Sequence, residues 1–291
     1  MAPVVLPNLF VIGAPKCGTS SLHFYLDRHP DISMSRVKEP YVFDTDDWRS
    51  RLARYEDLFD PGAVWRGESS TSYSRYPIWG DVPARIHEAV PDAKLIYLVG
   101  DPVERLISDY VQAVAGGVEH RPIDQALRDF TNPSHYYVAA SRYATQIEGY
   151  LRQFERGSLL VIEQWELRHA QADVLDQVFR FLGLDPGFRS WRFRSEVGTR
   201  RDQVRLRSLG LRLRDTTAGR AIRRLPREVR EPIVRAARRF FAEKVTRPDL
   251  DPSLRAELID FLRPEIKCLR ELTGKPLEHW PDRQPAGSLV S

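Results

Sequence analysis

A lysine, two glycines and three consecutive hydroxyl residues lie close together near the start of the chain. Lys16 stands between Gly13 and Gly18, and residues 19–21 read Thr-Ser-Ser. The apolar run 9–12 before them has the length of a buried strand, and the glycines end it as a loop would. Hydroxyl residues favour the first turn of a helix, where free backbone N–H groups and the helix dipole attract an anion. The stretch therefore predicts a strand, an anion-binding loop and a helix.

The order of these residues differs from that of the phosphate-binding loop of nucleotide hydrolases. That loop needs lysine directly after its second glycine, whereas here Thr19 follows Gly18 and Lys16 precedes it. The order Pro-Lys-Cys-Gly-Thr-Ser resembles instead the 5′-phosphosulfate loop of sulfotransferases that use 3′-phosphoadenosine 5′-phosphosulfate (PAPS). A plain strand-to-helix turn with a surface lysine is the alternative. The resemblance implies a catalytic Lys16 and the PAPS-binding residues Lys16, Cys17, Gly18, Thr19, Ser20 and Ser21.

A glutamate between a lysine and a proline is the next candidate for chemistry. Residues 38–44 read Lys-Glu-Pro-Tyr-Val-Phe-Asp, which resembles the Lys-Glu-Pro-x-x-Phe segment of glycan-type and bacterial sulfotransferases. In that family the glutamate is usually taken as the general base, so the resemblance implies this role for Glu39. A carboxylate within hydrogen-bond reach can take the proton of an attacking alcohol. Lys38 is expected to contact the acceptor. A surface Lys–Glu pair beside a turn is the alternative.

Two further side chains are expected near the acceptor. Residues 67–73 read Gly-Glu-Ser-Ser-Thr-Ser-Tyr and resemble a family segment at the edge of the active site. Glu68 is then either a second acidic group or a structural hydrogen-bond acceptor. Several carbohydrate-acting relatives carry lysine where this chain has Ser69, which weakens the case for an anionic sugar. Tyr143 either faces the acceptor pocket, as the resemblance implies, or packs in the core.

A second strand-to-helix unit carries the residues expected to bind the 3′-phosphate of PAPS. The apolar run 95–99 predicts a buried strand, and the Asp-Pro pair after it is typical of a helix start. Residues 101–110 resemble the family's 3′-phosphate segment, with Ser108 at the serine that contacts the phosphate. The family's arginine before Asp-Pro is replaced by Gly100. Loss of one charge-assisted hydrogen bond, about 1.5–3 kcal/mol, weakens binding roughly tenfold to a hundredfold.

Three explanations of Gly100 are open. Another arginine compensates, PAPS binds weakly, or this chain has lost activity; we favour compensation because the other motif residues are present. Residues 195–202 read Ser-Glu-Val-Gly-Thr-Arg-Arg-Asp and resemble a family loop that closes over PAPS, with a solvated basic loop as the alternative. Adjacent arginines offer bidentate donors to phosphate. The expected cofactor-binding residues outside the first loop are therefore Ser108, Arg105, Gly198, Arg200 and Arg201.

The elements that must hold these residues alternate along the chain. Apolar runs at 9–12, 95–99 and 159–163 predict buried strands, and amphipathic stretches predict helices, among them one long helix over 165–182. This alternation favours a parallel sheet covered on both faces. Together with the resemblance, it predicts an α/β fold: a P-loop-like three-layer sandwich with a central parallel sheet flanked by helices.

We expect a single sulfotransferase-like domain over residues 1–281, with Trp280 packed on it, and a flexible tail at 282–291. Residues 205–245 form an Arg-rich segment within the domain that is expected to be helical. We favour an apolar stripe that packs on the domain while the arginines face solvent. Binding of this segment to a membrane surface or an acidic partner is the alternative.

Composition limits the classes of protein. The 291 residues are 42% hydrophobic and carry a net charge of +4, which suits an anionic ligand but does not by itself indicate nucleic acid. The sequence has no apolar run near the ~18 residues that span a membrane and no obvious signal peptide. Two cysteines fit a reducing compartment, so we expect a cytoplasmic protein. No histidine and cysteine cluster has metal-site spacing, so no metal is expected.

The residues and the resemblance together imply a PAPS-dependent sulfotransferase that moves a sulfuryl group to a hydroxyl of a small molecule or saccharide by in-line displacement. Glu39 would accept the hydroxyl proton, while Lys16 and the loop amides would neutralise charge on the leaving phosphate. Two other classes remain. One is a non-catalytic or PAPS-binding protein on a decayed sulfotransferase scaffold. The other, less favoured, is an ATP-dependent small-molecule kinase.

Overall fold

Five strands form the central sheet of the computed structural model, which describes residues 5–194, 204–206 and 242–283. Every neighbouring pair of these strands is parallel. Their carboxyl ends therefore meet at one edge of the sheet, which is where open α/β sheets bind ligands. From one side of the sheet to the other the strands are β2 (Ile32–Met34), β3 (Trp65–Ser69), β1 (Leu9–Gly13), β4 (Lys94–Val99) and β5 (Leu159–Glu163).

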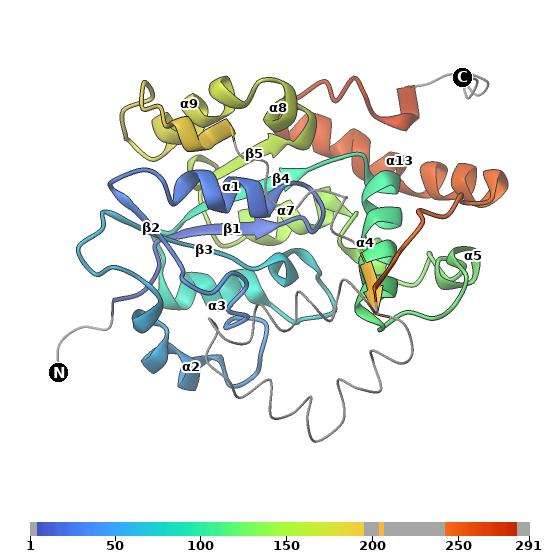
Figure 1. Cartoon of the computed structure of the whole chain (residues 1–291), viewed down its shortest axis with the longest axis horizontal. Helices are drawn as coiled ribbons and strands as arrows, with labels where there is room; N and C mark the ends of the chain where they lie inside the picture. Colours follow the sequence, from blue (N-terminus) through green and yellow to red (C-terminus); the bar gives the residue numbers. More distant parts are fainter. Residues whose placement is uncertain (1–4, 195–203, 207–241, 284–291) are drawn as a thin grey trace.

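Helices cover both faces of the sheet (Figure 1). Helices α1 (Thr19–Leu26), α8 (Gln164–His169) and α9 (Gln171–Phe181) lie on one face. Helix α3 (Val82–Ala89) lies on the other face, and α7 (Tyr143–Leu151) packs against α3. The expected three-layer α/β arrangement is confirmed. The single long helix expected over 165–182 is wrong, because Ala170 leaves helical geometry (φ −131°, ψ 46°) and separates α8 from α9.

The strands differ in how clearly the sequence predicts them. Every residue of β1 is buried, as expected of a central parallel strand with helices on both faces. Strand β3 lies between β1 and the edge strand β2, and it reads Trp-Arg-Gly-Glu-Ser without an apolar run. The sequence therefore did not predict β3, nor its short neighbour β2. Gly67 lets the two approach closely: a Cβ on Gly67 would stand 2.3 Å from Sδ of Met34. The close contact between Gly67 and Met34 therefore packs β3 against β2 although β3 has no apolar run.

Helix α4 (Pro102–Gly116) begins as the sequence predicts. The Asp101 carboxylate accepts hydrogen bonds from the amides of Val103 and Glu104 at 2.9 and 3.0 Å, which caps the first turn. This fixes the start of α4 directly after β4, beside the loop that follows β1. The described residues also form helices α2 (Trp48–Arg51), α5 (Ile123–Ala126), α6 (Tyr136–Ala139) and α13 (Pro252–Thr273).

The Arg-rich segment 205–245 begins and ends in short strands. Strands β6 (Val204–Leu206) and β7 (Ala242–Lys244) pair in antiparallel fashion. The expectation of a helical segment is therefore wrong at both ends, while residues 207–241 lie outside the described part of the chain, as does the expected tail beyond 283. Within the described ranges, no helix combines the length and the apolar character needed to cross a membrane.

The chain after α13 returns to the end of β5. The Trp280 indole Nε1 donates to Glu163 Oε1 at 2.8 Å, and Lys275 Nζ lies 2.7 Å from a carboxylate oxygen of Glu166. The ring of His279 stacks on Trp165 with centroids 4.2 Å apart. Trp280 is buried, which confirms that it packs on the domain.

Candidate functional site

The loop between β1 and α1 depends on two glycines. Gly13 has φ +145°, and a Cβ on it would stand 1.9 Å from the Ser74 hydroxyl oxygen. Gly18 caps α1 in the left-handed conformation, with φ +99°. Side chains rarely adopt such backbone angles, so both positions require glycine. The chain turns sharply between them and presents the start of α1 at the carboxyl end of the sheet.

The first turn of α1 offers backbone donors. The first N–H groups of a helix lack intrahelical acceptors, and Gly18 has no side chain to cap them. Thr19 is buried, whereas Ser20 and Ser21 are partly exposed. This group of amides, with a helix dipole behind it, can hold an anion.

The side chain of Cys17, predicted to bind the cofactor, does not face an open site. Its thiol is buried, and its amide donates to the carbonyl of Ala14 at 3.2 Å. Burial raises the pKa of the thiol to about 11, so it stays protonated at neutral pH. Cys17 packs beneath the loop, 3.8 Å from the Tyr143 hydroxyl.

Lys16 connects the two predicted phosphate-binding segments. Its Nζ donates to Oε1 of Gln112 on α4 at 2.7 Å. Ser108 lies one helical turn before Gln112, so it shares that face of α4. The structure therefore brings Lys16 and the Ser108 face of α4 together from the ends of neighbouring strands. The sequence did not predict a role for Gln112, because no local motif indicates a contact between residues 96 positions apart.

Arg105 does not compensate for Gly100. Only 2% of it is exposed, and its guanidinium donates to Asp109 Oδ2 at 3.0 Å and to the Ser141 hydroxyl at 2.7 Å. Asp109 also accepts a hydrogen bond from buried Arg75 at 2.9 Å, and both arginines hold its pKa below the usual value despite burial. The guanidinium of Arg105 thus bonds buried groups and does not face the site. The other compensation candidates, Arg200 and Arg201, lie outside the described residues, as does the predicted cofactor-binding Gly198.

Glu39 lies at the same edge of the sheet, beside β3. Its amide donates to the carbonyl of Ser69, the last residue of β3, at 3.0 Å. Lys38 Nζ donates to Oε1 at 2.5 Å, and the Tyr41 hydroxyl donates to Oε2. The side chain keeps 25% of its surface exposed. Burial and the bond to Glu39 raise the pKa of Tyr41, so its hydroxyl remains a donor.

His23 is a neighbour of Glu39 that sequence analysis missed. Its Nδ1 lies 2.9 Å from the Ser69 hydroxyl, which joins α1 to β3. Burial, followed by the nearby charge of Lys38, lowers the pKa of His23 to about 4. The imidazole is therefore neutral at pH 7. No motif predicts this contact, because His23 and Ser69 are 46 residues apart.

Glu68 is a structural acceptor rather than a second acid at the surface. It is fully buried and accepts hydrogen bonds from the Tyr55 hydroxyl at 2.9 Å and the Ser70 hydroxyl at 2.8 Å. Burial raises its pKa to about 7. The Tyr73 hydroxyl in turn accepts from the amides of Val42 and Phe43, both at 3.2 Å, which ties this network to the Glu39 segment.

Tyr143 belongs to the core, which corrects its assignment to the acceptor site. It is 1% exposed, and its hydroxyl donates to the carbonyl of Gly100 at 2.9 Å. Its ring lies against Trp280, with centroids 5.6 Å apart. With both its ring and its hydroxyl engaged, Tyr143 supports the end of β4.

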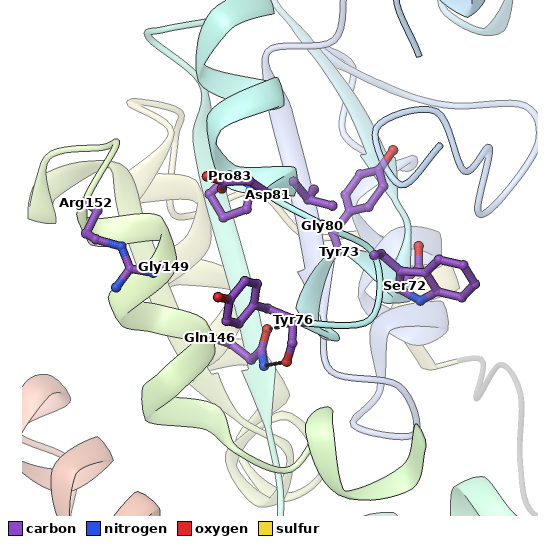
Figure 2. A pocket seen from close by; sticks show the side chains of 11 residues that line it. Ser72, Tyr73, Tyr76, Gly80, Asp81, Pro83, Gln146, Gly149 and Arg152 are labelled. Atoms are coloured by element: carbon purple, nitrogen blue, oxygen red, sulfur yellow. Dashed lines mark hydrogen bonds between the residues drawn. The ribbon is translucent and has the colours of Figure 1, made fainter. Parts of the chain in front are cut away.

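A pocket lies between the start of α3 and the side of α7 (Figure 2). The Gln146 amide group bonds both the amide and the carbonyl of Tyr76, at 2.9 and 3.0 Å. The buried hydroxyl of Ser72 has no hydrogen-bond partner among the described residues. No predicted catalytic or cofactor-binding residue lines this pocket, so it is distinct from the candidate site.

Comparison with known proteins identifies the family of this chain. Residues 6–197, more than half of the chain, match the family model described as "Sulfotransferase domain". The chain belongs to the sulfotransferase family. The match confirms the family that the sequence resembles.

Two curated relatives act on saccharides by name. Heparan sulfate glucosamine 3-O-sulfotransferase 3B1 of Mus musculus is 32% identical over 188 residues, which cover 62% of this chain and 46% of that protein. Carbohydrate sulfotransferase 15 of Mus musculus is 25% identical over 248 residues, with 62% and 44% covered. The chain spans about half the length of the curated relatives it matches.

Solved structures share the fold over most of the chain. A sulfotransferase from Alicyclobacillus acidocaldarius is 25% identical with a TM-score of 0.65, covering 94% of this chain and 98% of that one. The mouse sulfotransferase SULT7A1 complexed with PAP has a TM-score of 0.52 at 14% identity, covering 92% and 88%. The second likeness concerns the fold alone.

Proposed function

We propose that this chain transfers a sulfuryl group from PAPS to a hydroxyl of a small molecule or saccharide by in-line displacement. The main support is the common location of two side chains. Lys16 follows β1, and the amide of Glu39 is bonded to the last residue of β3, the strand next to β1. A cationic loop and a carboxylate thus lie at one edge of the sheet, on adjacent strands.

The loop residues fit a phosphosulfate group. The uncapped first turn of α1 supplies amides, and Lys16 supplies a cation at its entrance. Bound PAPS contributes a sulfuryl group whose departure leaves 3′-phosphoadenosine 5′-phosphate (PAP). Lys16 exchanges its contact with Gln112 for the anion, and together with the amides of residues 18–21 it stabilises charge on the departing phosphate. Ser108 on α4 is the described candidate for the 3′-phosphate, while Gly198, Arg200 and Arg201 stay predictions.

Glu39 accepts the proton of the attacking hydroxyl in this proposal. Each carboxylate oxygen has two lone pairs, so a third donor can bind while Lys38 and Tyr41 remain in place. These two neighbours fix the orientation of the carboxylate. A positioned base of this kind contributes about 10²–10⁴-fold to rate.

The acceptor in this proposal packs against Tyr41 and contacts Lys38. The Tyr41 ring is 41% exposed beside the carboxylate of Glu39, and an exposed aromatic face suits a sugar or another ring. The names of the two curated relatives specify heparan sulfate glucosamine and carbohydrate. A saccharide is therefore our first choice and a smaller hydroxylated metabolite our second.

We further propose one domain over residues 1–281, acting in the cytoplasm. Trp280 supports the first point, because it joins the chain after α13 to the end of β5. The two cysteines, Cys17 and Cys268, are both free thiols, which suits a reducing compartment.

Calorimetry with PAP, with ATP as the comparison ligand, tests the nucleotide. We expect PAP to bind at micromolar concentration and ATP to bind at least about tenfold more weakly, because ATP lacks the 3′-phosphate. A screen of hydroxylated acceptors with ³⁵S-labelled PAPS tests the transfer. No PAP binding at high micromolar concentration would contradict the proposal and favour a decayed scaffold.

A further inference from the structure

Gly100, which replaces the family's arginine, lies against the side chains of Gln164 and Cys17. A Cβ on Gly100 would stand 3.1 Å from Oε1 and 3.4 Å from Cβ of Gln164, and 3.3 Å from Sγ of Cys17. The 3.1 and 3.3 Å separations are tighter than ordinary Cβ contacts, so a side chain at position 100 requires Gln164 and Cys17 to shift by a few tenths of an ångström. The backbone is held in place, because the Tyr143 hydroxyl donates to the Gly100 carbonyl at 2.9 Å.

Gln164 uses the space that Gly100 leaves. It stands at the start of α8, directly after β5, and its Nε2 donates to the carbonyl oxygen of Lys16 at 2.8 Å. Lys16 has a left-handed backbone, with φ +70°. That conformation is unfavourable for a residue with a side chain and persists where surrounding groups hold it. The hydrogen bond from Gln164 supplies such support.

We infer that Gln164 is a positioning residue for the phosphosulfate loop, and that Gly100 is the substitution that makes room for it. The inference rests on the proposed function, because it assigns Gln164 a role in holding Lys16 against bound PAPS. The stem of an arginine at position 100 and the side chain of Gln164 compete for the same volume. Gly100 is then one half of an alternative loop support, and it does not mark decay.

A double-mutant cycle on Gly100→Ala and Gln164→Ala tests the inference, with PAP affinity measured by calorimetry. Each single variant is expected to weaken PAP binding about threefold to tenfold, the effect of one neutral hydrogen bond. The double variant is expected to bind no more weakly than Gln164→Ala, because both changes remove the same bond. Gly157→Ala is the matched control, since a Cβ there meets nothing within 4 Å.

Turnover separates positioning from a purely structural role. Gln164→Met keeps the length of the side chain and removes the donor. With an acceptor found in the labelled-PAPS screen, we expect its kcat to fall about tenfold, since misplacement of a reacting group acts on the transition state. The KM for the acceptor should change less than about twofold, because Glu39 lies beside β3 and Gln164 follows β5 at the other side of the sheet.

The possible outcomes separate the two proposals. If the wild-type chain does not bind PAP, the proposed function is rejected and this inference with it. If the wild type binds PAP and both Gln164 variants bind it equally well with unchanged kcat, the inference alone is rejected. Strictly additive losses in the double variant also reject it, because Gly100 and Gln164 would then act separately.

Discussion

The cofactor side and the acceptor side of the candidate site are built in different ways. The loop after β1 is shaped by backbone: Gly13 and Gly18 adopt positive φ, and the first turn of α1 presents its amides. On the Glu39 side, the neighbours Lys38 and Tyr41 hold the carboxylate, while the polar network behind it joins residues that lie apart in the sequence: Tyr55 to Glu68 and His23 to Ser69. The turn of the loop is therefore set by its own glycines, whereas the network behind Glu39 depends on pairs of residues that lie apart in the sequence.

This difference decides where single substitutions act. A change in the loop removes charge or a turn that no other residue can supply, so it affects chemistry first. A change in the Glu68 and His23 network alters buried titratable groups, so it affects the pH dependence of stability first. Four substitutions, taken from the largest expected effect to the smallest, test this contrast.

Lys16→Ala is expected to have the largest effect, because it removes the cation of the loop that we propose binds the phosphosulfate group. We expect kcat to fall about 10⁴-fold, as for other groups that neutralise transferring oxyanions. Single-turnover assays with labelled PAPS measure this loss. Lys267→Ala, on the exposed face of α13, is the control and should turn over normally. Retention of more than a tenth of the wild-type rate in Lys16→Ala would remove the loop from the mechanism.

Glu39→Gln is expected to lower kcat about 10³-fold while PAP affinity stays within about threefold, because the amide cannot accept the hydroxyl proton. Calorimetry and turnover measured on the same preparation separate these two effects. Glu271→Gln, an exposed glutamate on α13, is the control. Equal losses of PAP affinity and kcat would mean that Glu39 belongs to the cofactor side.

Glu68→Gln is expected to change the pH dependence of stability. The folded-state pKa of Glu68 is raised to about 7 from an ordinary value of 4.5. The protonated form is therefore favoured in the folded state, and its stabilising contribution is full below pH 4.5 and lost as pH rises through 7. This amounts to about 3 kcal/mol. Urea unfolding of both proteins at pH 5 and 8 should show a wild-type loss that the variant lacks; parallel profiles would contradict the assignment.

His23→Gln is expected to have the smallest effect, with the opposite sign. Burial lowers the pKa of His23 from 6.5 to about 4, so its contribution is full above pH 6.5 and is lost as pH falls towards 4. Because the ring is only partly buried, we expect about 1–2 kcal/mol. Unfolding midpoints at pH 4.5 and 7 should differ more for wild type than for the variant. An unchanged difference would show that the imidazole stays neutral for other reasons.

The sequence predicted the fold best where one short stretch carries the information. The apolar runs of β1, β4 and β5 and the cap of α4 were predicted correctly. Strand β3 was missed because Arg66 and Glu68 interrupt any apolar pattern, and Glu68 is buried only through the hydroxyls of Tyr55 and Ser70. Such a strand is recognisable only when its partners are known.

The residues of the candidate site likewise fall into those that a local motif predicts and those that it does not. Motif resemblance named Lys16 and Glu39, and the structure places both at one edge of the sheet. The expectation that Arg105 compensates for Gly100 failed, because the sequence does not show that its guanidinium bonds the buried Asp109, which it shares with Arg75. Gln164 carried no sequence signal at all, since its partner Lys16 lies 148 residues away.

The return of the chain after α13 determines how much protein the catalytic unit needs. The family match ends at residue 197, yet the buried carboxylate of Glu163 receives its hydrogen bond from Trp280. A fragment that stops near the end of the match removes this donor and leaves the Glu163 side chain with the backbone N–H of Glu166 in the capping box of α8, at a cost of about 1–3 kcal/mol. Such a fragment also loses the contacts of Lys275 with Glu166 and of His279 with Trp165, which hold α8, the helix that begins with Gln164. Chimaeras between sulfotransferases should therefore exchange the C-terminal return together with the first two thirds of the chain.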